Sequence, residues 1–254
     1  MPLRKVIGIH SCKEALKQRD SKDIHCLYLK ENWIKNPSLK DLVQLAKRKN
    51  LKIETVSLKK INRMLDRKDL SHQGVLLELV PFFPKLSFAK IAKEDSATVL
   101  ILDRIQDPKN LGAILRTCWL MSVNSVFLSS QKTVGLTPSV IKSASGAVEH
   151  LPIFIEDNLH YVIKELKKHS FWIYALSPFA KKTLWDENLQ RRKAFVFGGE
   201  HSGLRNSLIK DCDEVLFLPQ KKNSASYNVS VAVAATLFET LRQKKIPLKK
   251  GELK

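Results

Sequence analysis

Apolar and polar positions in the first 80 residues repeat with two periods. Apolar residues at 39, 42, 43 and 46 recur at the spacing of a helix, whereas 26–29 alternates like a strand. A helix following 6–9 has Ser11 as its expected N-cap. The pattern predicts strands at 6–9, 26–29, 52–56 and 74–80, and helices from Lys13, at 37–49 and at 57–65. Residues 1–80 are therefore expected to form a small αβ domain.

The pattern changes after residue 80. Two prolines flank two aromatic residues at 81–84, which suits a stiff link rather than a helix, so 81–96 is expected to be a linker. A fully apolar run at 97–102, bounded by Asp103, is typical of a buried parallel strand. Further strands are predicted at 125–128, 153–155, 172–175, 194–197 and 214–218, and helices at 111–121, 139–144, 159–169 and 207–211.

This alternation predicts an open α/β sheet in a domain that spans 97–245, with a basic tail at 246–254. In such sheets, ligands bind beyond the carboxyl ends of the strands, so the loops there are the places to look for chemistry.

The charge narrows the class of partner. The chain carries 44 Lys and Arg against 25 Asp and Glu, a formal net charge of +19. Residues 1–96 hold 21 basic against 11 acidic residues, and the rest hold 23 against 14, so both domains are basic. A protein can simply be basic, but an excess of this size favours a polyanionic partner such as a nucleic acid.

The sequence lacks the patterns that are typical of metal-binding, membrane-spanning and secreted proteins. The four cysteines form no C-x-x-C pair and the seven histidines show no ligand spacing, so no metal is expected. The longest apolar run, 229–238, is too short for a bilayer, and the first residues lack a signal-peptide core. No membrane partner and a cytoplasmic location are expected.

The loop after the strand at 97–102 runs from Asp103 through Asp107-Pro108-Lys-Asn110 to Gly112 and Arg116. Pro108 and Gly112 suit a tight turn, and Asn110 can cap the helix. Arg116 follows about one and a half turns later and is expected to face the same side as Asn110. A capped helix with a solvated arginine is the simpler alternative.

Two further loops are unusual. After the strand at 194–197 comes Gly198-Gly199-Glu200, where glycines let a backbone approach a ligand, although neither the dinucleotide nor the P-loop fingerprint is present. After 214–218, Leu218 leads through a polar run to Ser226, Tyr227 and Asn228, directly before an apolar helix. Either loop alone is explained by helix capping, but three such loops together indicate a binding site.

In order, D-x-x-x-D-P-x-N-x-G-x-x-x-R, F-G-G-E-x-x-G-L and L-P-x₆-S-x-N-V-S-V-A resemble the three signature motifs of the SpoU (TrmH) family of RNA ribose 2′-O-methyltransferases. The resemblance covers nearly the whole chain and is closest to members that modify a guanosine of 23S rRNA. It implies a SPOUT fold: a trefoil-knotted parallel-sheet methyltransferase domain, preceded here by a small αβ RNA-binding domain. It also implies S-adenosylmethionine as methyl donor and a homodimer.

The resemblance also implies roles for particular residues. Cofactor contacts fall on the four residues Gly198, Gly199, Leu218 and Tyr227, and the catalytic set on Arg116, Asn110, Glu200, Ser226 and Asn228. Tyr227 stands where the family usually has leucine. The dimer interface is expected on the helix at 229–242, whose apolar stripe (Val231, Ala234, Ala235, Phe238) can equally be core.

The role of Arg116 stays open between a base and a cation that stabilises the developing alkoxide, because guanidinium groups normally remain protonated. Two other functions also fit the sequence: a tRNA ribose methyltransferase, and a catalytically silent rRNA-binding assembly factor.

Overall fold

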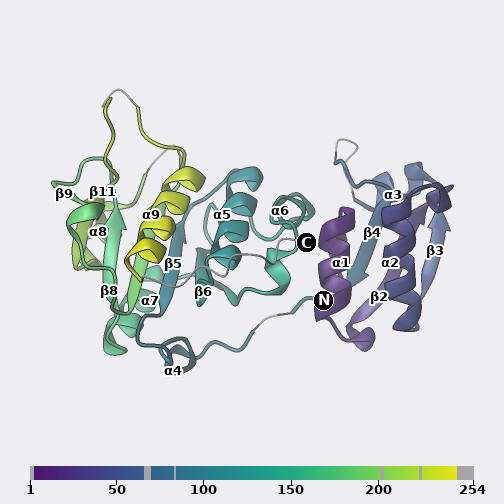
Figure 1. The fold of residues 1–254 in the computed structure, drawn as a ribbon, viewed down its shortest axis with the longest axis horizontal. Helices are drawn as coiled ribbons and strands as arrows, with labels where there is room; N and C mark the ends of the chain where they lie inside the picture. Colours follow the sequence, from purple (N-terminus) through teal and green to yellow (C-terminus); the bar gives the residue numbers. More distant parts are fainter. Residues whose placement is uncertain (1–2, 66–69, 83, 201–202, 223–224, 245–254) are drawn as a thin grey trace. The chain divides into compact units, whose positions relative to one another are not determined.

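The computed structural model describes residues 3–65, 70–82, 84–200, 203–222 and 225–244, so the predicted tail at 246–254 lies outside it. The chain divides into two units, and Figure 1 shows its ribbon coloured along the sequence. Unit 1 comprises Met1–Lys85, Gln106–Trp119 and Val134–Ile153, and unit 2 comprises Leu86–Ile105, Leu120–Thr133 and Phe154–Lys254. These units are discontinuous in sequence, whereas the predicted domains are continuous, and the predicted limits stay a prediction.

Unit 1 contains a four-stranded sheet in the order β1-β4-β2-β3. The second strand in this order, β4, pairs antiparallel with both neighbours, and β2 pairs parallel with β3. The strands are β1 (Arg4–Ile7), β2 (Ile24–Lys30), β3 (Ile53–Val56) and β4 (Val75–Leu79). The helices of this unit are α1 (Ile9–Gln18), α2 (Pro37–Arg48), α3 (Leu58–Met64), α5 (Pro108–Leu120) and α6 (Pro138–Ser143), with short 3₁₀ turns η1 (Ser21–Asp23), η2 (Trp33–Lys35) and η3 (Ala147–Glu149).

Helices cover both faces of this sheet. Ile61 and Leu65 at α3 pack with Ile7, Tyr28 and Leu76 on one face. Successive strand side chains point to opposite faces, so the equally buried neighbours of these residues face the other side, where α1 contacts β1, β4 and α2. The predicted αβ domain is confirmed in its elements.

The start of α1 differs from its prediction. Strand β1 ends at Ile7, two residues earlier than expected, because Gly8 turns the chain with a left-handed φ of 88°. Gly8 is therefore the N-cap of α1. Ser11 instead lies buried in the first turn and donates from its hydroxyl to the carbonyl of Ile141 at 3.2 Å.

Unit 2 contains a seven-stranded sheet in the order β7-β6-β5-β10-β8-β11-β9, and the pairs from β6 to β9 are all parallel. Its strands are β5 (Thr98–Asp103), β6 (Ser125–Ser129), β7 (Ile153–Glu156), β8 (Trp172–Leu176), β9 (Lys182–Thr183), β10 (Lys193–Gly198) and β11 (Glu214–Phe217). The helices are α4 (Phe88–Ile91), α7 (Leu159–Lys168), α8 (Asn206–Asp211) and α9 (Val229–Gln243), with a 3₁₀ turn η4 (Leu184–Asp186). The predicted open parallel sheet is confirmed, whereas β9 and α4 were not predicted.

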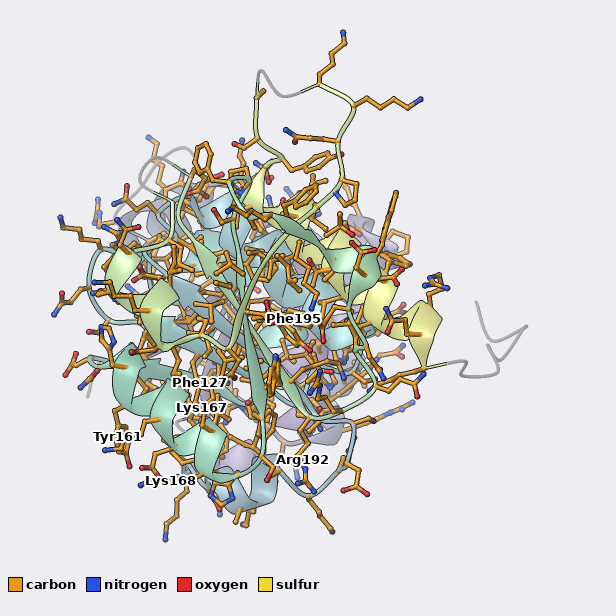
Figure 2. The ribbon with its side chains drawn as sticks, turned by 90° about the vertical axis from the view of Figure 1, so that its left-hand side faces the viewer. Phe127, Tyr161, Lys167, Lys168, Arg192 and Phe195 are labelled. Carbon is orange, nitrogen blue, oxygen red and sulfur yellow. The ribbon has the colours of Figure 1, made fainter. Side chains whose placement is uncertain are left out.

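One face of this sheet forms the main core. Four apolar residues of α7, at 159, 162, 163 and 166, pack with Val99, Phe127 and Val196 of the central strands. Ile91 of α4 joins them, so the end of the predicted linker belongs to this core. Phe127 and Phe195 lie in the interior in Figure 2, whereas Tyr161 and Lys168 of α7 lie at its edge. The resemblance places the knot loops at 197–203 and 218–228, and both include undescribed residues, so the trefoil knot stays a prediction.

Within the described residues, no helix combines the length and apolarity needed to cross a bilayer. The same part of the chain holds no cluster of three or more His, Cys, Asp or Glu side chains arranged to bind a metal. The four cysteines are free, and Cys12, Cys26 and Cys118 are buried.

A buried carboxylate joins three elements of unit 2. Glu187 accepts hydrogen bonds from Tyr174 Oη at 2.9 Å, Lys182 Nζ at 2.5 Å and Arg191 Nη2 at 2.9 Å. Gln243 at the end of α9 donates to its backbone carbonyl at 3.0 Å. Burial alone would raise the pKa of Glu187, but the hydrogen bonds from Lys182 and Tyr174 and the charge of Lys182 outweigh it and lower the pKa.

The Glu187→Gln variant should therefore be less stable at neutral pH by about 1–3 kcal/mol, since hydrogen bonds to a charged group are lost. Because the pKa of Glu187 is lowered on folding, its stabilisation is complete above the ordinary carboxyl pKa and disappears as the pH falls through the folded-state pKa. Denaturant unfolding from pH 7 to pH 3 should show the stability difference between wild type and variant shrinking. As a control, Asp95→Asn removes the exposed pair with Arg192 and should have little effect. A pH-independent difference would contradict this account.

Candidate active site

The carboxyl end of β5 holds a buried, paired charge. Asp103 is the last residue of this strand and is fully buried, rather than lying beyond the strand as predicted. Arg205 donates to it with two prongs, from Nε to Oδ2 and from Nη2 to Oδ1, both at 2.9 Å. Arg104 adds a third bond from its Nε to Oδ2 at 3.3 Å. The carboxylate is thus compensated in the arrangement that best offsets the cost of burying it.

The loop that follows β10 packs backbone against backbone. A Cβ on Gly198 would lie 2.1 Å from the carbonyl carbon of Gly203, and one on Gly199 would lie 2.2 Å from the carbonyl oxygen of Arg104. Gly203 donates its N–H to the carbonyl of Gly199 at 3.0 Å and accepts from Arg104 Nη2 at 3.3 Å. The glycines are therefore required by the protein's own backbone before any ligand is considered. Their contacts with a cofactor stay a prediction.

The loop that leads into α9 is closed by its own hydrogen bonds. Tyr227 donates from its hydroxyl to the carbonyl of Pro219 at 3.0 Å, and Gln220 Nε2 donates to the carbonyl of Ala225 at 3.2 Å. Asn228 is the N-cap of α9: its Oδ1 accepts from the N–H of Ser230 at 2.9 Å and from its hydroxyl at 2.7 Å. Capping thus explains one residue of this loop, whereas the exposed Ser226 does not contribute to the cap.

A pocket of about 420 Å³ opens beside this loop. Two of the four predicted cofactor residues, Leu218 and Tyr227, line it, whereas Gly198 and Gly199 do not. Its walls are mostly apolar, with two charged side chains at one end, and its size suits a small ligand. The lining residues are Leu184, Trp185, Leu218, Pro219, Tyr227, Ala235, Phe238, Glu239 and Arg242.

Two predicted catalytic residues, Asn110 and Arg116, lie on α5 in unit 1. Asp107, rather than Asn110, caps this helix: its carboxylate accepts from the N–H of Lys109 at 3.1 Å and of Asn110 at 3.3 Å. Arg116 is exposed and Asn110 half-buried. Six residues correspond to about 600° of rotation, so the two side chains point about 120° apart rather than to one side as predicted.

Gly112 of α5 marks a close approach of two helices. A Cβ there would lie 2.3 Å from the Cβ of Ser143 and 2.9 Å from the carbonyl oxygen of Val140, both in α6. Glycine at this position is thus explained by helix packing rather than by the predicted turn.

The described part of unit 2 brings the predicted residues Gly198 and Gly199 against the end of β5, and Leu218 and Tyr227 to one pocket. The sequence analysis missed Asp103 and Arg205 as a positioning pair. An acidic residue that closes a fully apolar strand was the available signal, since a buried carboxylate needs a cationic partner.

Arg205→Ala should leave the Asp103 carboxylate buried with Arg104 alone, and should lower the free energy of unfolding by about 3–5 kcal/mol. Arg205→Lys keeps the charge but loses the two-pronged geometry, so it should cost less. Chemical denaturation measures both, and Lys210→Ala on α8 is a matched control at an exposed cation. Equal stability of wild type and Arg205→Ala would contradict the role given to this pair.

Two family models match the chain. Residues 97–238 match the SpoU rRNA methylase family, and residues 5–84 match the substrate-binding domain of RNA 2′-O ribose methyltransferases. The solved SpoU methyltransferase AviRb from Streptomyces viridochromogenes, in complex with AdoMet, has the same fold: the TM-score is 0.81 at 16% identity, over 96% of this chain and 91% of AviRb.

Curated relatives match over nearly their whole length. The 23S rRNA (guanosine-2′-O-)-methyltransferase RlmB of Xylella fastidiosa is 33% identical over 243 residues, which cover 94% of this chain and 96% of RlmB. A putative TrmH family tRNA/rRNA methyltransferase of Staphylococcus haemolyticus is 31% identical, over 94% of this chain and 95% of that protein. With both domains matched in order, the chain belongs to the SpoU family of RNA ribose 2′-O-methyltransferases.

Proposed function

We propose that this protein methylates the ribose 2′-hydroxyl of a guanosine in 23S rRNA, with S-adenosylmethionine as methyl donor. The observation that carries the proposal is the 33% identity to RlmB, because it extends over 243 residues and so includes both the substrate-binding and the methylase domain. The net charge of +19 fits an RNA substrate.

The chain's own loops fit such a cofactor. When bound, S-adenosylmethionine supplies an electrophilic methyl group on a sulfonium centre, with a neutral thioether as leaving group. Leu218 and Tyr227 line a mostly apolar pocket of suitable volume, and the resemblance of the second motif adds Gly198 and Gly199, which do not line that pocket. These four residues would hold the cofactor. No general acid is needed, since the leaving group carries no charge.

The protein's task is therefore to activate a weakly acidic hydroxyl. Arg116 is exposed on α5, and its guanidinium is a permanent cation with five donors in a planar fork. We assign it the stabilisation of the negative charge that develops on the ribose oxygen. The family motifs assign Asn110 and Glu200 to positioning of the reacting groups, and Ser226 and Asn228 to the third loop at the target.

Arg116→Ala should lower kcat/KM for methyl transfer by about 10²–10³-fold while cofactor affinity stays unchanged, as is typical when one oxyanion-stabilising donor is lost. Arg116→Lys keeps the charge without the fork and should retain part of the rate if charge stabilisation is the role. The measurement is transfer from labelled S-adenosylmethionine to unmodified rRNA and tRNA, with mapping of each new alkali-resistant linkage.

A resistant linkage at one 23S rRNA guanosine, lost in Arg116→Ala, is the expected result. A resistant linkage found only in tRNA would show that the substrate is tRNA rather than 23S rRNA. Cofactor and RNA binding without any ribose mark would contradict the enzymatic function and favour an assembly factor.

A homodimer is part of the proposal. The buried side of α9 carries Val229, Val233 and Leu237, whereas two members of the predicted interface stripe, Val231 and Phe238, are 51% and 60% exposed. Trp185 is 67% exposed and lines the same pocket as Phe238. Large apolar residues exposed together on one surface mark an interaction site, and a second copy of this chain fits the helix-to-helix contact expected there.

Phe238→Glu should convert the dimer to a monomer, because a charge would have to be buried at the centre of the interface. Sedimentation of wild type and variant at several concentrations measures this, and Arg242→Glu at the end of the same helix tests whether a rim charge has a smaller effect. A monomeric wild type would contradict the proposed assembly.

A further inference from the structure

The carboxylates of Glu14, Glu54 and Glu149 in unit 1 each form ion pairs with two basic side chains. Glu149 pairs with both Arg4 and Arg19, and its side chain is only 1% exposed. Glu14 pairs with Lys17 and His150, and Glu54 with Lys52 and Lys60. Five half-buried lysines of this unit make no ion pair among the described residues: Lys5 and Lys49 donate to backbone carbonyls instead, and the others are Lys13, Lys30 and Lys142. Two of them are Lys30, at the end of β2, and Lys142, in α6.

These two lysines converge on one small area. The stem of Lys142 lies over Gly8, since a Cβ there would be 3.3 Å from Cγ of the lysine. The stem of Lys30 lies over Gly74, where a Cβ would be 2.5 Å from its Cδ. Gln73 connects the two glycines: its Oε1 accepts from the N–H of Ile9 at 2.9 Å and lies 3.3 Å from the Cβ position of Gly8.

The residue between them is a neutral histidine. The N–H of Gly74 donates to Nδ1 of His72 at 3.0 Å, so this nitrogen carries no proton and Nε2 donates to Oδ1 of Asn62 at 3.1 Å. Burial, and then the charges of Lys142 and Lys30, lower the pKa of His72. In this arrangement of hydrogen bonds His72 is uncharged, and the charges of both lysines act on it.

Neighbouring contacts hold Lys142 in this place. Ser11 of α1 donates to the carbonyl of Ile141, the residue before the lysine. A Cβ on Gly146 would lie 2.6 Å from the Cβ of Glu14, so α1 lies directly against the chain that follows α6. His150 bonds to Glu14 at 3.1 Å and stacks on Trp119 with ring centroids 4.4 Å apart. Neither lysine has an ion pair among the described residues, and the charges of both act at His72, so an anion bound there would be attracted by both.

We propose that a phosphodiester of the substrate RNA binds between Lys30 and Lys142, beside the exposed Gln73. This site rests on the proposed function and extends it, because one lysine comes from the substrate-binding match and the other from the methylase match. Gly8 and Gly74 are buried under the two lysine stems, so the phosphate would meet the ends of the lysines and the exposed amide of Gln73, which can donate to it. The contact is to the backbone of RNA, so it carries no base preference.

The test is RNA binding by the full-length chain at a series of salt concentrations. Lys30→Ala and Lys142→Ala should each weaken binding and reduce the slope of log K against log salt by about 1, and the double variant by about 2. The change should be the same for unmodified 23S rRNA and tRNA transcripts. Lys142→Arg should restore the slope. Lys40→Ala removes an equally positive but exposed lysine of α2 and should leave the slope unchanged.

Two further measurements distinguish failure of this phosphate site from failure of the proposed function. Cofactor binding should not fall in either variant, and the thermal midpoint without RNA measures separately any packing that is lost with the lysine stems. If wild type binds RNA but marks no ribose, the proposed function fails, while the slopes still decide the site. Slopes equal to wild type in both variants, or equally reduced in Lys40→Ala, would overturn the phosphate site.

Discussion

The loop that follows β10 depends on one buried charge, the carboxylate of Asp103. It ends the central strand β5 in a fully buried position, where an unpaired carboxylate would cost several kcal/mol. The guanidinium of Arg205, about a hundred residues later in the sequence, donates two hydrogen bonds to this carboxylate. The loop between β10 and α8 must therefore follow a path that brings Arg205 to Asp103. The first signature motif is thereby joined to the residue that follows the second, and the bond from Arg104 to the carbonyl of Gly203 adds a link between the motifs themselves.

This constraint explains why glycine is needed at the end of β10. With Arg205 fixed on Asp103, the loop has to pass directly against the carbonyl of Arg104, and a Cβ at Gly199 would meet that oxygen at 2.2 Å. Arg104 itself adopts a left-handed φ of 58°. Such contacts are made by backbone and need few particular side chains, which is consistent with the same fold in AviRb at only 16% identity.

Periodicity predicted most of the strands and helices, because burial of one face or both leaves a local signal. It could not predict β9, which has two residues, or α4, whose four residues owe their order to packing of Ile91 in the core. Asp103 was placed outside its strand because the partner that permits its burial is distant in sequence. For Asn110, three candidate caps stood close together, and only the hydrogen bonds of Asp107 distinguish them. The motifs predicted the residues of the candidate site. The contacts that hold their loops, such as the ion pair between Asp103 and Arg205, became visible only in the structure.

The net charge of the protein shows where an anion can bind only when the ion pairs between basic side chains and carboxylates are taken into account. With 44 cations against 25 carboxylates, at least 19 basic side chains cannot have their own acidic partner. Glu14 and Glu149 already form ion pairs that join α1 to the segment after α6. Because these carboxylates are paired there, they do not also neutralise Lys30 and Lys142. The carboxylates that fix the architecture therefore also decide where positive potential remains. A polyanion is attracted most strongly to places where cations are held rigidly and left uncompensated, since little further ordering is needed on binding.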